Sequence, residues 1–345
     1  MRKMPLPQRD NAGGRTYVRA AALANYISVA KDLGLNPYKL LRAAGIDINL
    51  LSTPDNRLPA DSVVSLLENS AQLSGRSDFG LRMAEARRLT DFGAISLLIM
   101  HQPTLRDVLT TLTRHLNTLN EALAMHVVDN GDLAIIKEDL VTDIPGAKAQ
   151  CVELIVGAMY GLLKNLLGDD WRPVSVHFTH GAPADLSTHR RFLKCDVEFE
   201  STFNGIVLPV SDLQKPNRTG DPALANYAQQ YLDTMHPDAP QSVIGEARKA
   251  IYLLLPLGAA SVARVARAVG MHERTLQRRL ASEGKEFSDL VKEARRDLAL
   301  RYISDRRHSI TRISETLGYG QLSSFTRWFS GEFGMSPAEW RRQRG

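Results

Sequence analysis

The sequence predicts two domains of different fold class. The first is an α+β domain, rich in helices with a small mixed sheet, and the second is an all-α domain in which a linker helix joins two helix-turn-helix units. The chain has 345 residues, enough for two or three domains. Apolar spacing changes from helical to strand-like near residue 120, and a short helical pattern occurs twice near the C-terminus.

The first eighty residues predict helices only. Residues 1–16 are polar and hold no long apolar run, so we expect a disordered leader there. Helical apolar spacing follows over Ala20–Leu33 and Tyr38–Ala44. Pro59 precedes a third amphipathic segment, and proline is favoured in the first turn of a helix.

A hairpin is expected after two further helices. The helices are predicted over Phe92–His101 and Leu105–Leu119, with Thr104 as the N-cap of the second. Strand-like segments then follow over Glu121–Val128 and Asp132–Lys137. The residues between them, Asp129-Asn130-Gly131, contain Asn-Gly, which tolerates positive φ and favours a tight turn.

The rest of the first domain is built around one long helix. Ala147–Leu167 is apolar on nearly all sides, which predicts a buried central helix. Pro173–Thr179 alternates between apolar and polar residues, as a half-buried strand does. A helix over Ala184–Leu193 and two short strands complete the domain: Asp196–Phe199 and Gly205–Leu208.

Proline-rich segments set the domain limits. We predict a leader at 1–16, a first domain at 17–210 and a linker at 211–239 that contains one helix, Ala223–Met235. The second domain then spans 240–345, with its first unit at about 241–285, the linker helix at 287–304 and the second unit at about 309–342.

Positive charge is concentrated in the second domain. Residues 240–345 carry 19 Lys and Arg against 11 Asp and Glu, a net charge of +8, whereas the rest carries 24 against 27, or −3. Such asymmetry is typical of a domain that neutralises phosphates, although a solvated basic surface has the same charge. Only two cysteines occur, so no disulfide framework or thiolate metal cluster is expected, and no cofactor, metal or membrane span is predicted.

The first helical repeat begins at residue 262. One helix face is apolar and a glycine follows it: Val262, Val265, Ala266, Val269 and Gly270. The next helix begins near His272 and is anchored by Leu276 and Leu280. Four side chains then point outward as candidate DNA contacts: Arg274, Thr275, Gln277 and Arg278. Arginine can bond guanine and glutamine adenine in the major groove, which admits a helix.

The second repeat has the same layout. Its first helix is followed by a glycine turn: Ile310, Ile313, Ser314, Leu317 and Gly318-Tyr319-Gly320. Phe325 and Phe329 are the expected anchors, and five residues beside them are candidate DNA contacts: Leu322, Ser323, Ser324, Thr326 and Arg327. Leu322 cannot hydrogen-bond a base, so this helix is expected to specify sequence less strongly. The helix over 287–304 would hold the two readers about one DNA turn apart.

These residues resemble the C-terminal signature of the AraC/XylS family of bacterial transcription factors. The likeness rests on Ile310–Tyr319, the pattern Phe325-x-Arg327-x-Phe329, Gly334–Pro337 and Trp340-Arg341. It departs from the family at Ser314, where alanine is usual. The resemblance implies that both reader helices enter successive major grooves of double-stranded DNA through the nine residues named above.

The first domain is similar, more diffusely, to the effector domain of the branch typified by ornithine-utilisation regulators. Val176–Phe178 and Gly205–Pro209 carry this likeness. It implies a domain that senses an unidentified small molecule and forms a homodimer, in a cytoplasmic, nucleoid-associated regulator that would contact RNA polymerase if it activates transcription. Met159, Tyr160 and Phe178 could line its pocket or belong to the core.

Three alternative functions are open: an enzyme, an alkyl-DNA repair protein and a non-specific nucleoid protein. For an enzyme, His177 and His180 are candidates, but the sequence shows no nearby carboxylate pattern, and neither a GxxxxGKS/T phosphate loop nor an HExxH pair occurs. Alkyl-DNA repair wants an activated thiolate, which Cys151, expected as a buried apolar residue, and Cys195 do not suggest. A non-specific nucleoid protein would bind through phosphates alone.

Overall fold

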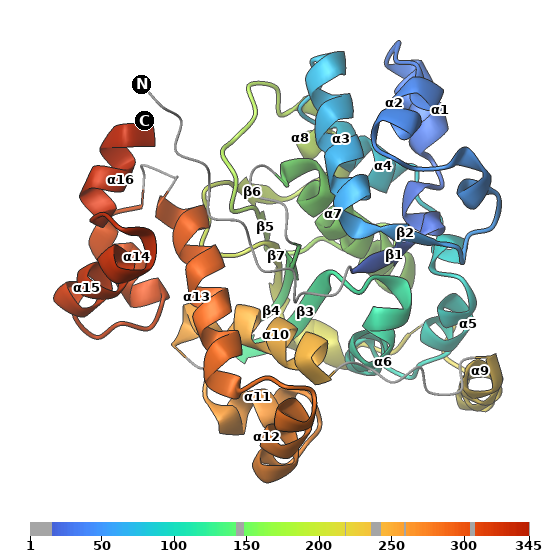
Figure 1. Cartoon of the computed structure of the whole chain (residues 1–345). Coiled ribbons are helices and arrows are strands. Elements are labelled where there is room, and N and C mark those ends of the chain that lie inside the picture. Colours follow the sequence, from blue (N-terminus) through green and yellow to red (C-terminus); the bar gives the residue numbers. More distant parts are fainter. Residues whose placement is uncertain are drawn as a thin grey trace.

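Two hydrophobic cores organise the chain, whose helices and strands are shown in Figure 1. The computed structural model describes residues 16–142, 148–217, 219–235, 243–258, 260–303 and 308–344. The predicted leader lies outside the described residues except for Thr16. The first core gathers residues from Val18 to Ala225, and the second gathers residues from Val243 to Phe329 together with Ala124 and Val141.

A five-stranded mixed sheet lies in the N-terminal domain, in the order β3-β4-β7-β5-β6. The pair β5–β6 is parallel and the other neighbours are antiparallel. The strands are β3 (Leu123–Asn130), β4 (Leu133–Leu140), β5 (Ser175–His177), β6 (Asp196–Glu198) and β7 (Gly205–Pro209). Alternate residues of β4 are buried, among them Ala134, Ile136, Glu138 and Leu140. This confirms the predicted helix-rich α+β class.

The described residues up to 235 also form helices. They are α1 (Tyr26–Asp32), α2 (Pro37–Ala43), α3 (Ala60–Ser74), α4 (Phe79–Glu85), α5 (Ala94–Met100), α6 (Leu105–Leu119), α7 (Ala149–Leu167), α8 (Ser187–Leu193) and α9 (Pro222–Met235). Of these, α6, α7 and α8 contact strands of the sheet. Helix α6 has the predicted bounds, Leu105–Leu119. Its start is fixed by a capping box that Thr104 and Asp107 form. Helix α7 packs against α3, α4 and β4, as expected of a central helix.

Contrary to the expectation that the chain has no segment of this kind, helix α7 has the length and apolar composition of a membrane-crossing helix. Most of its most apolar stretch, 67%, is buried inside the protein. Core helices of globular domains pass the same compositional test, so this feature carries no membrane assignment.

The prediction that the first eighty residues are wholly helical is wrong. Strands β1 (Tyr17–Arg19) and β2 (Arg57–Pro59) pair antiparallel, with Val18 opposite Leu58, 40 positions along the chain, and only such a long-range partner makes strands of three residues stable. Pro59 therefore ends β2 and precedes α3 instead of lying in its first turn. The expected helix over 20–33 is divided into the 3₁₀ helix η1 (Ala20–Leu23) and α1.

Two strand predictions also need correction. The hairpin loop consists of Gly131, at φ 66°, and Asp132, because Asn130 already pairs with Leu133. Residues 175–178 are buried without alternation. The reason is that β5 is an inner strand, between β7 and β6, and the polar face is sealed by hydrogen bonds of His177 to Ser175 and Ser201.

The C-terminal domain is all-helical, as predicted. It consists of α10 (Val243–Leu254), α11 (Val262–Ala268), α12 (Glu273–Ser282), α13 (Phe287–Ile303), α14 (Ile310–Thr316), α15 (Leu322–Phe333) and α16 (Pro337–Arg344). Serines cap the first helix of each repeat, with Ser261 accepting from the Arg264 amide and Ser309 from the Arg312 amide. The two units lie at opposite ends of α13 (Figure 1).

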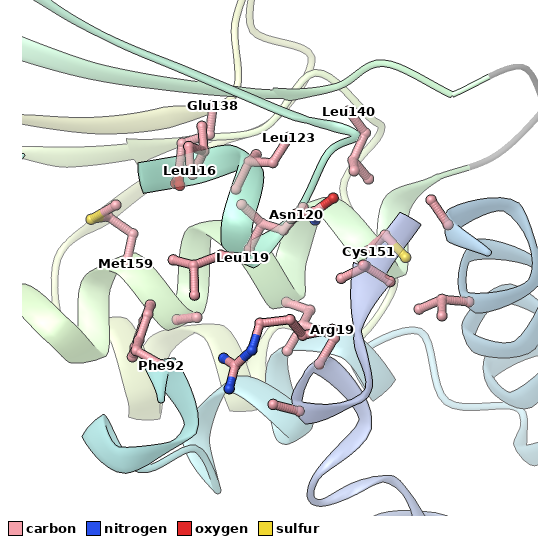
Figure 2. Close-up of a pocket in the computed structure, with 18 of the residues that line it drawn as sticks. Arg19, Phe92, Leu116, Leu119, Asn120, Leu123, Glu138, Leu140, Cys151 and Met159 are labelled. Carbon is pink, nitrogen blue, oxygen red and sulfur yellow. The ribbon is translucent and has the colours of Figure 1, made fainter. Parts of the chain in front are cut away.

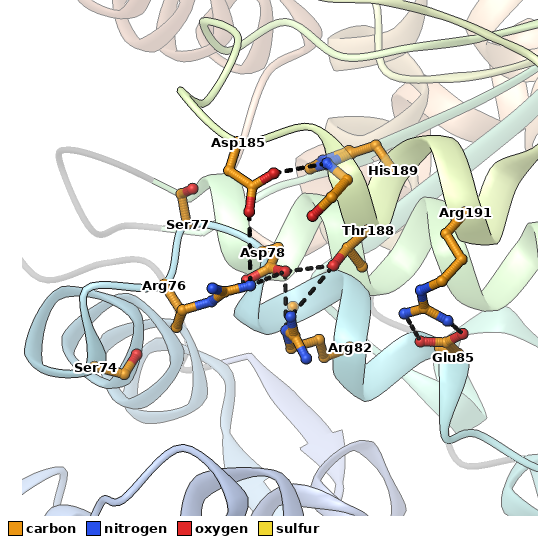
Figure 3. Close-up of polar contacts among 12 residues, drawn as sticks. Ser74, Arg76, Ser77, Asp78, Arg82, Glu85, Asp185, Thr188, His189 and Arg191 are labelled. Atoms are coloured by element: carbon orange, nitrogen blue, oxygen red, sulfur yellow. Dashed lines mark hydrogen bonds and ion pairs between the residues drawn. The ribbon is translucent and has the colours of Figure 1, made fainter.

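A buried carboxylate fastens α4 to α8 (Figure 3). Asp78 accepts hydrogen bonds from Arg76, Arg82 and Thr188 at 2.6–3.1 Å. Burial raises the pKa of Asp78, but these hydrogen bonds and the arginine charges outweigh it and lower the pKa to about 2. All of its bonding capacity is used within the fold, so we interpret this cluster as structural.

Candidate functional site

Helix α12 presents a polar surface opposite its buried anchors. Leu276 and Leu280 are fully buried in the second core, which confirms the predicted helix phase. Arg274, Gln277 and Arg278 are exposed and Thr275 is half-buried. Within the part of the chain that the structure describes, neither Arg274 nor Arg278 forms an ion pair.

Helix α15 repeats this arrangement. Phe325 and Phe329 are fully buried. Thr326 is half-buried, and the other four predicted contacts are exposed: Leu322, Ser323, Ser324 and Arg327. The Thr326 hydroxyl donates to the Leu322 carbonyl at 2.9 Å, so it retains only acceptor capacity for a base.

One continuous helix, α13, lies between the two helix-turn-helix units. Helix α13 has 17 residues, a length of about 25 Å. At its second half, Arg295 donates to the Leu317 carbonyl at 3.2 Å and lies over the Tyr319 ring, 5.2 Å from its centroid. The glycines of the two turns, Gly270 and Gly318, have φ values of 66° and 79°, which favour glycine over residues with a side chain.

The N-terminal domain contains a cavity with about 930 Å³ of empty space, its mouth included. It lies between η1, α3, α6, α7 and strands β3 and β4. All but five of its described lining residues are apolar, and the exceptions are Arg19, Arg87, Asp91, Asn120 and Glu138. Figure 2 shows Glu138 on the sheet side and Arg19 on the opposite side, with leucines and Met159 between them.

Of the three residues that the sequence suggested for a pocket or the core, one lines this cavity. Met159 does, whereas Tyr160 and Phe178 are fully buried core residues and do not line it. Cys151 also lines the cavity, and burial raises the pKa of its thiol far above the ordinary value, so it stays an unreactive thiol. The sequence did not indicate that Arg19, Arg87 and Glu138 line a cavity. Only Glu138 could have been recognised, because it is a charged residue at a position of β4 where the alternating pattern predicts a buried apolar one.

The two candidate catalytic histidines do have carboxylates nearby, contrary to expectation. Glu198 lies 3.5 Å from Nδ1 of His177. The fully buried Glu153 of α7 lies 3.5 Å from Nε2 of His180 and 2.9 Å from Nε2 of His189. The Glu153–His189 contact joins α7 to α8, and the ring of Phe199 packs on those of Phe178 and His189. Among described residues, no group of His, Cys, Asp and Glu is arranged to hold a metal.

Helix α10, the first helix of the C-terminal domain, packs against the N-terminal domain. The Asn117 amide of α6 donates to the Glu246 carboxylate of α10 and accepts from the Lys249 ammonium. Ala124 of β3 belongs to the second core. Burial lowers the pKa of Lys249 to about 8, although Glu246 and Glu121 oppose this shift.

Comparisons with known proteins agree with this geometry. Residues 34–217 match the family model described as the arabinose-binding domain of AraC transcription regulators, and residues 265–343 match a helix-turn-helix domain. The transcriptional regulator VirS of Mycobacterium tuberculosis is 30% identical over 96% of this chain and 98% of its own length. The ornithine utilization regulator of Pseudomonas aeruginosa is 20% identical over 91% of this chain and 93% of its own.

A solved structure is also similar, that of the transcriptional regulator CdpR from Pseudomonas aeruginosa. It shares 24% identity, with a TM-score of 0.43, and the match covers 89% of this chain and 96% of that one. The family models and the full-length relatives decide the assignment. The chain belongs to the AraC family of transcription regulators, with an N-terminal ligand-binding domain and a C-terminal helix-turn-helix DNA-binding domain.

Proposed function

We propose that α12 and α15 read bases in two neighbouring major grooves, through Arg274, Thr275, Gln277 and Arg278 of the first and Leu322, Ser323, Ser324, Thr326 and Arg327 of the second. The observation that carries this is that seven of these nine residues are exposed, and Thr275 and Thr326 half-buried, opposite fully buried anchors. Phosphate contacts would set the register, and the arginine and glutamine side chains would set the sequence.

The test is a competition between cognate and random DNA. Cognate DNA is first enriched from a random library with the wild-type protein. Arg278→Ala should then cost about 1–3 kcal/mol on cognate DNA and relax the preference at one base pair, with little change on random DNA. Lys39→Ala, which removes an exposed lysine of α2, is the matched control and should change neither affinity. Equal losses on both DNAs for Arg278→Ala would exclude base reading.

We propose that an effector binds in the cavity and acts on α10 through residues 116–125. Leu116, Leu119 and Leu123 line the cavity, whereas Asn117 and Ala124 contact the second domain. One short segment therefore touches both the ligand and the docked helix. A ligand can shift the domain arrangement only by its difference in affinity between the arrangements, and movement of this segment would supply that difference.

We also propose that the protein forms a homodimer. A second copy of the chain would pack on α5 and α9, which contact each other and expose Leu97, Leu224 and Tyr227. Light scattering should then give the mass of a dimer, and a Tyr227→Glu variant should be monomeric; a monomeric wild type would contradict this. RNA polymerase would be a partner if the protein activates transcription, and the protein would act in the cytoplasm on the nucleoid.

Neither an enzyme nor a non-specific nucleoid protein is favoured by a specific observation. The relatives named above are transcription regulators, and the cysteine that lines the cavity carries an unreactive thiol. Mass spectrometry after incubation with methylated DNA would detect methyl transfer to Cys151 or Cys195 if alkyl-DNA repair were the function.

A further inference from the structure

Two polar side chains that line the cavity each have a buried atom without a hydrogen-bond partner, Nε of Arg87 and Oε2 of Glu138, and only the Glu138 carboxyl has no opposite charge beside it. Glu138 is only 3% exposed, and its Oε2 has no hydrogen-bond partner in the structure. Burial raises the pKa of Glu138 well above its ordinary value, and no neighbouring charge opposes this. Its neighbour Lys137 projects from the other face of β4, toward the Phe203 ring. A buried carboxyl without a partner is costly, so a ligand group at this place would stabilise it.

The opposite end of the cavity is different, because its charges are already balanced. The Arg19 guanidinium donates to Asp55 at 2.7 Å and to the Asp91 backbone carbonyl at 3.0 Å. Arg87 lies over the Phe92 ring, 5.7 Å from its centroid. Burial lowers the pKa of the Arg87 guanidinium, and the Asp91 charge opposes this shift. Two arginines thus face two aspartates, and this end offers an anionic ligand little net attraction.

The walls between the two ends are apolar. They come from α6, α7 and β3, with Leu112, Leu116, Leu154 and Met159 among the lining residues. A sugar carries hydroxyl groups around its whole ring, and most of them would lose hydrogen bonds with water against such walls. The cavity is therefore unsuited to the sugar for which the matching family model is named.

We infer that the cavity takes an elongated, predominantly apolar molecule whose hydrogen-bond-donating head group, an amine or a hydroxyl, binds the Glu138 carboxyl. This inference rests on the proposed effector role of the cavity. An ammonium would pair with the ionised carboxylate, and a hydroxyl would bond with the carboxyl in either protonation state. Both head groups supply the partner that Glu138 lacks, and the apolar body fills the space between the leucines and Met159.

The test measures direct binding to the full-length protein by calorimetry, with probes kept below their critical micelle concentrations. The probes are decylamine, 1-decanol, decanoic acid and L-arabinose. We expect the amine, the alcohol or both to bind at least tenfold more tightly than decanoic acid, with no arabinose binding at millimolar concentration. Tighter binding of decanoic acid or of arabinose would overturn the inference, as would no binding by any probe.

Three variants separate head-group recognition from general apolar binding. Glu138→Met should weaken the binding of the preferred probe at least tenfold, and Glu138→Gln should weaken an amine but retain an alcohol. Ala158→Phe, at another lining residue, should block every probe by filling the cavity. Unchanged binding by Glu138→Met would overturn the head-group assignment. If Glu138→Met fails to fold, the Glu138→Gln comparison still decides between retained and lost recognition.

The DNA-binding proposal is measured separately. Selective DNA binding by a protein that binds no probe would refute this inference and leave base reading intact. Binding of a probe by a protein that shows no sequence preference would refute base reading and leave the ligand class intact.

Discussion

The buried hydroxyl of Ser314 should destabilise the second helix-turn-helix unit. Ser314 is fully buried on α14, and its Oγ has no hydrogen-bond partner in the structure. A buried polar group without a partner costs about 1–3 kcal/mol, whereas removing one atom from the core costs a fraction of this in lost contacts. We therefore predict that Ser314→Ala raises the free energy of unfolding of this domain by about 1 kcal/mol, or roughly 4–8 °C in melting temperature.

Two neighbouring serines provide matched controls for this prediction. Ser309 caps α14 by accepting from the Arg312 amide at 3.0 Å, so Ser309→Ala should destabilise by about 1 kcal/mol. Ser324 is exposed on α15, so Ser324→Ala should change stability by less than about 0.5 kcal/mol. One substitution type thus gives three different outcomes, depending on where the hydroxyl lies.

Urea unfolding followed by tryptophan fluorescence is the assay. Two of the three tryptophans, Trp328 and Trp340, lie in the second unit and pack against Phe333, so the signal reports mainly on this unit. A destabilised Ser314→Ala variant would refute the reasoning, because it would mean that the hydroxyl contributes a favourable hydrogen bond.

Three further predictions concern the anchors, the acid stability and the docked helix. Leu276→Asp places a charge at a fully buried position and should unfold the first unit, with loss of helical circular dichroism and of DNA binding; unchanged melting would show that the helix phase is wrong. The folded pKa of Asp78, about 2, lies below its ordinary 3.8, so its stabilisation is present above about pH 4 and is lost as the pH falls toward 2. Asp78→Asn should flatten this acid slope in urea titrations, and an unaltered slope would contradict the assignment. The pKa of Lys249, lowered from 10.5 to about 8, means that the undocked state binds more protons between these values, so docking should strengthen as the pH rises from 8 to 10.5; limited proteolysis of the interdomain segment should slow over this range in the wild type and not in Lys249→Met.

Local sequence signals predicted the parts of the fold that local interactions stabilise. The α6 bounds follow from the Thr104 capping box, and Asn130-Gly131 indicated the β3–β4 hairpin, although its loop is Gly131-Asp132. The reader helices were placed correctly because Leu276 and Leu280 recur at one helical turn. The β1–β2 pair was missed because its stability comes from a partner 40 residues away, which no local pattern records.

The cavity could not be predicted in the same way. Its lining residues run from Val18 to Met159, and only the tertiary fold brings them together. Glu138 was nevertheless visible as a charged residue in the buried register of β4. The docking of α10 on Asn117 also joins residues about 130 positions apart, so the link between the cavity and the DNA-binding domain emerges only from the structure.

The most direct test of the account is the pattern of sequences that the full-length protein enriches from random double-stranded DNA. Two readers held by the rigid helix α13 predict two short blocks of preferred bases whose centres lie about 10 base pairs, one helical turn, apart. The block read by α12 should be the stronger, because Leu322 of α15 cannot bond a base. Enrichment without any sequence preference, or of two blocks at variable spacing, would contradict the account.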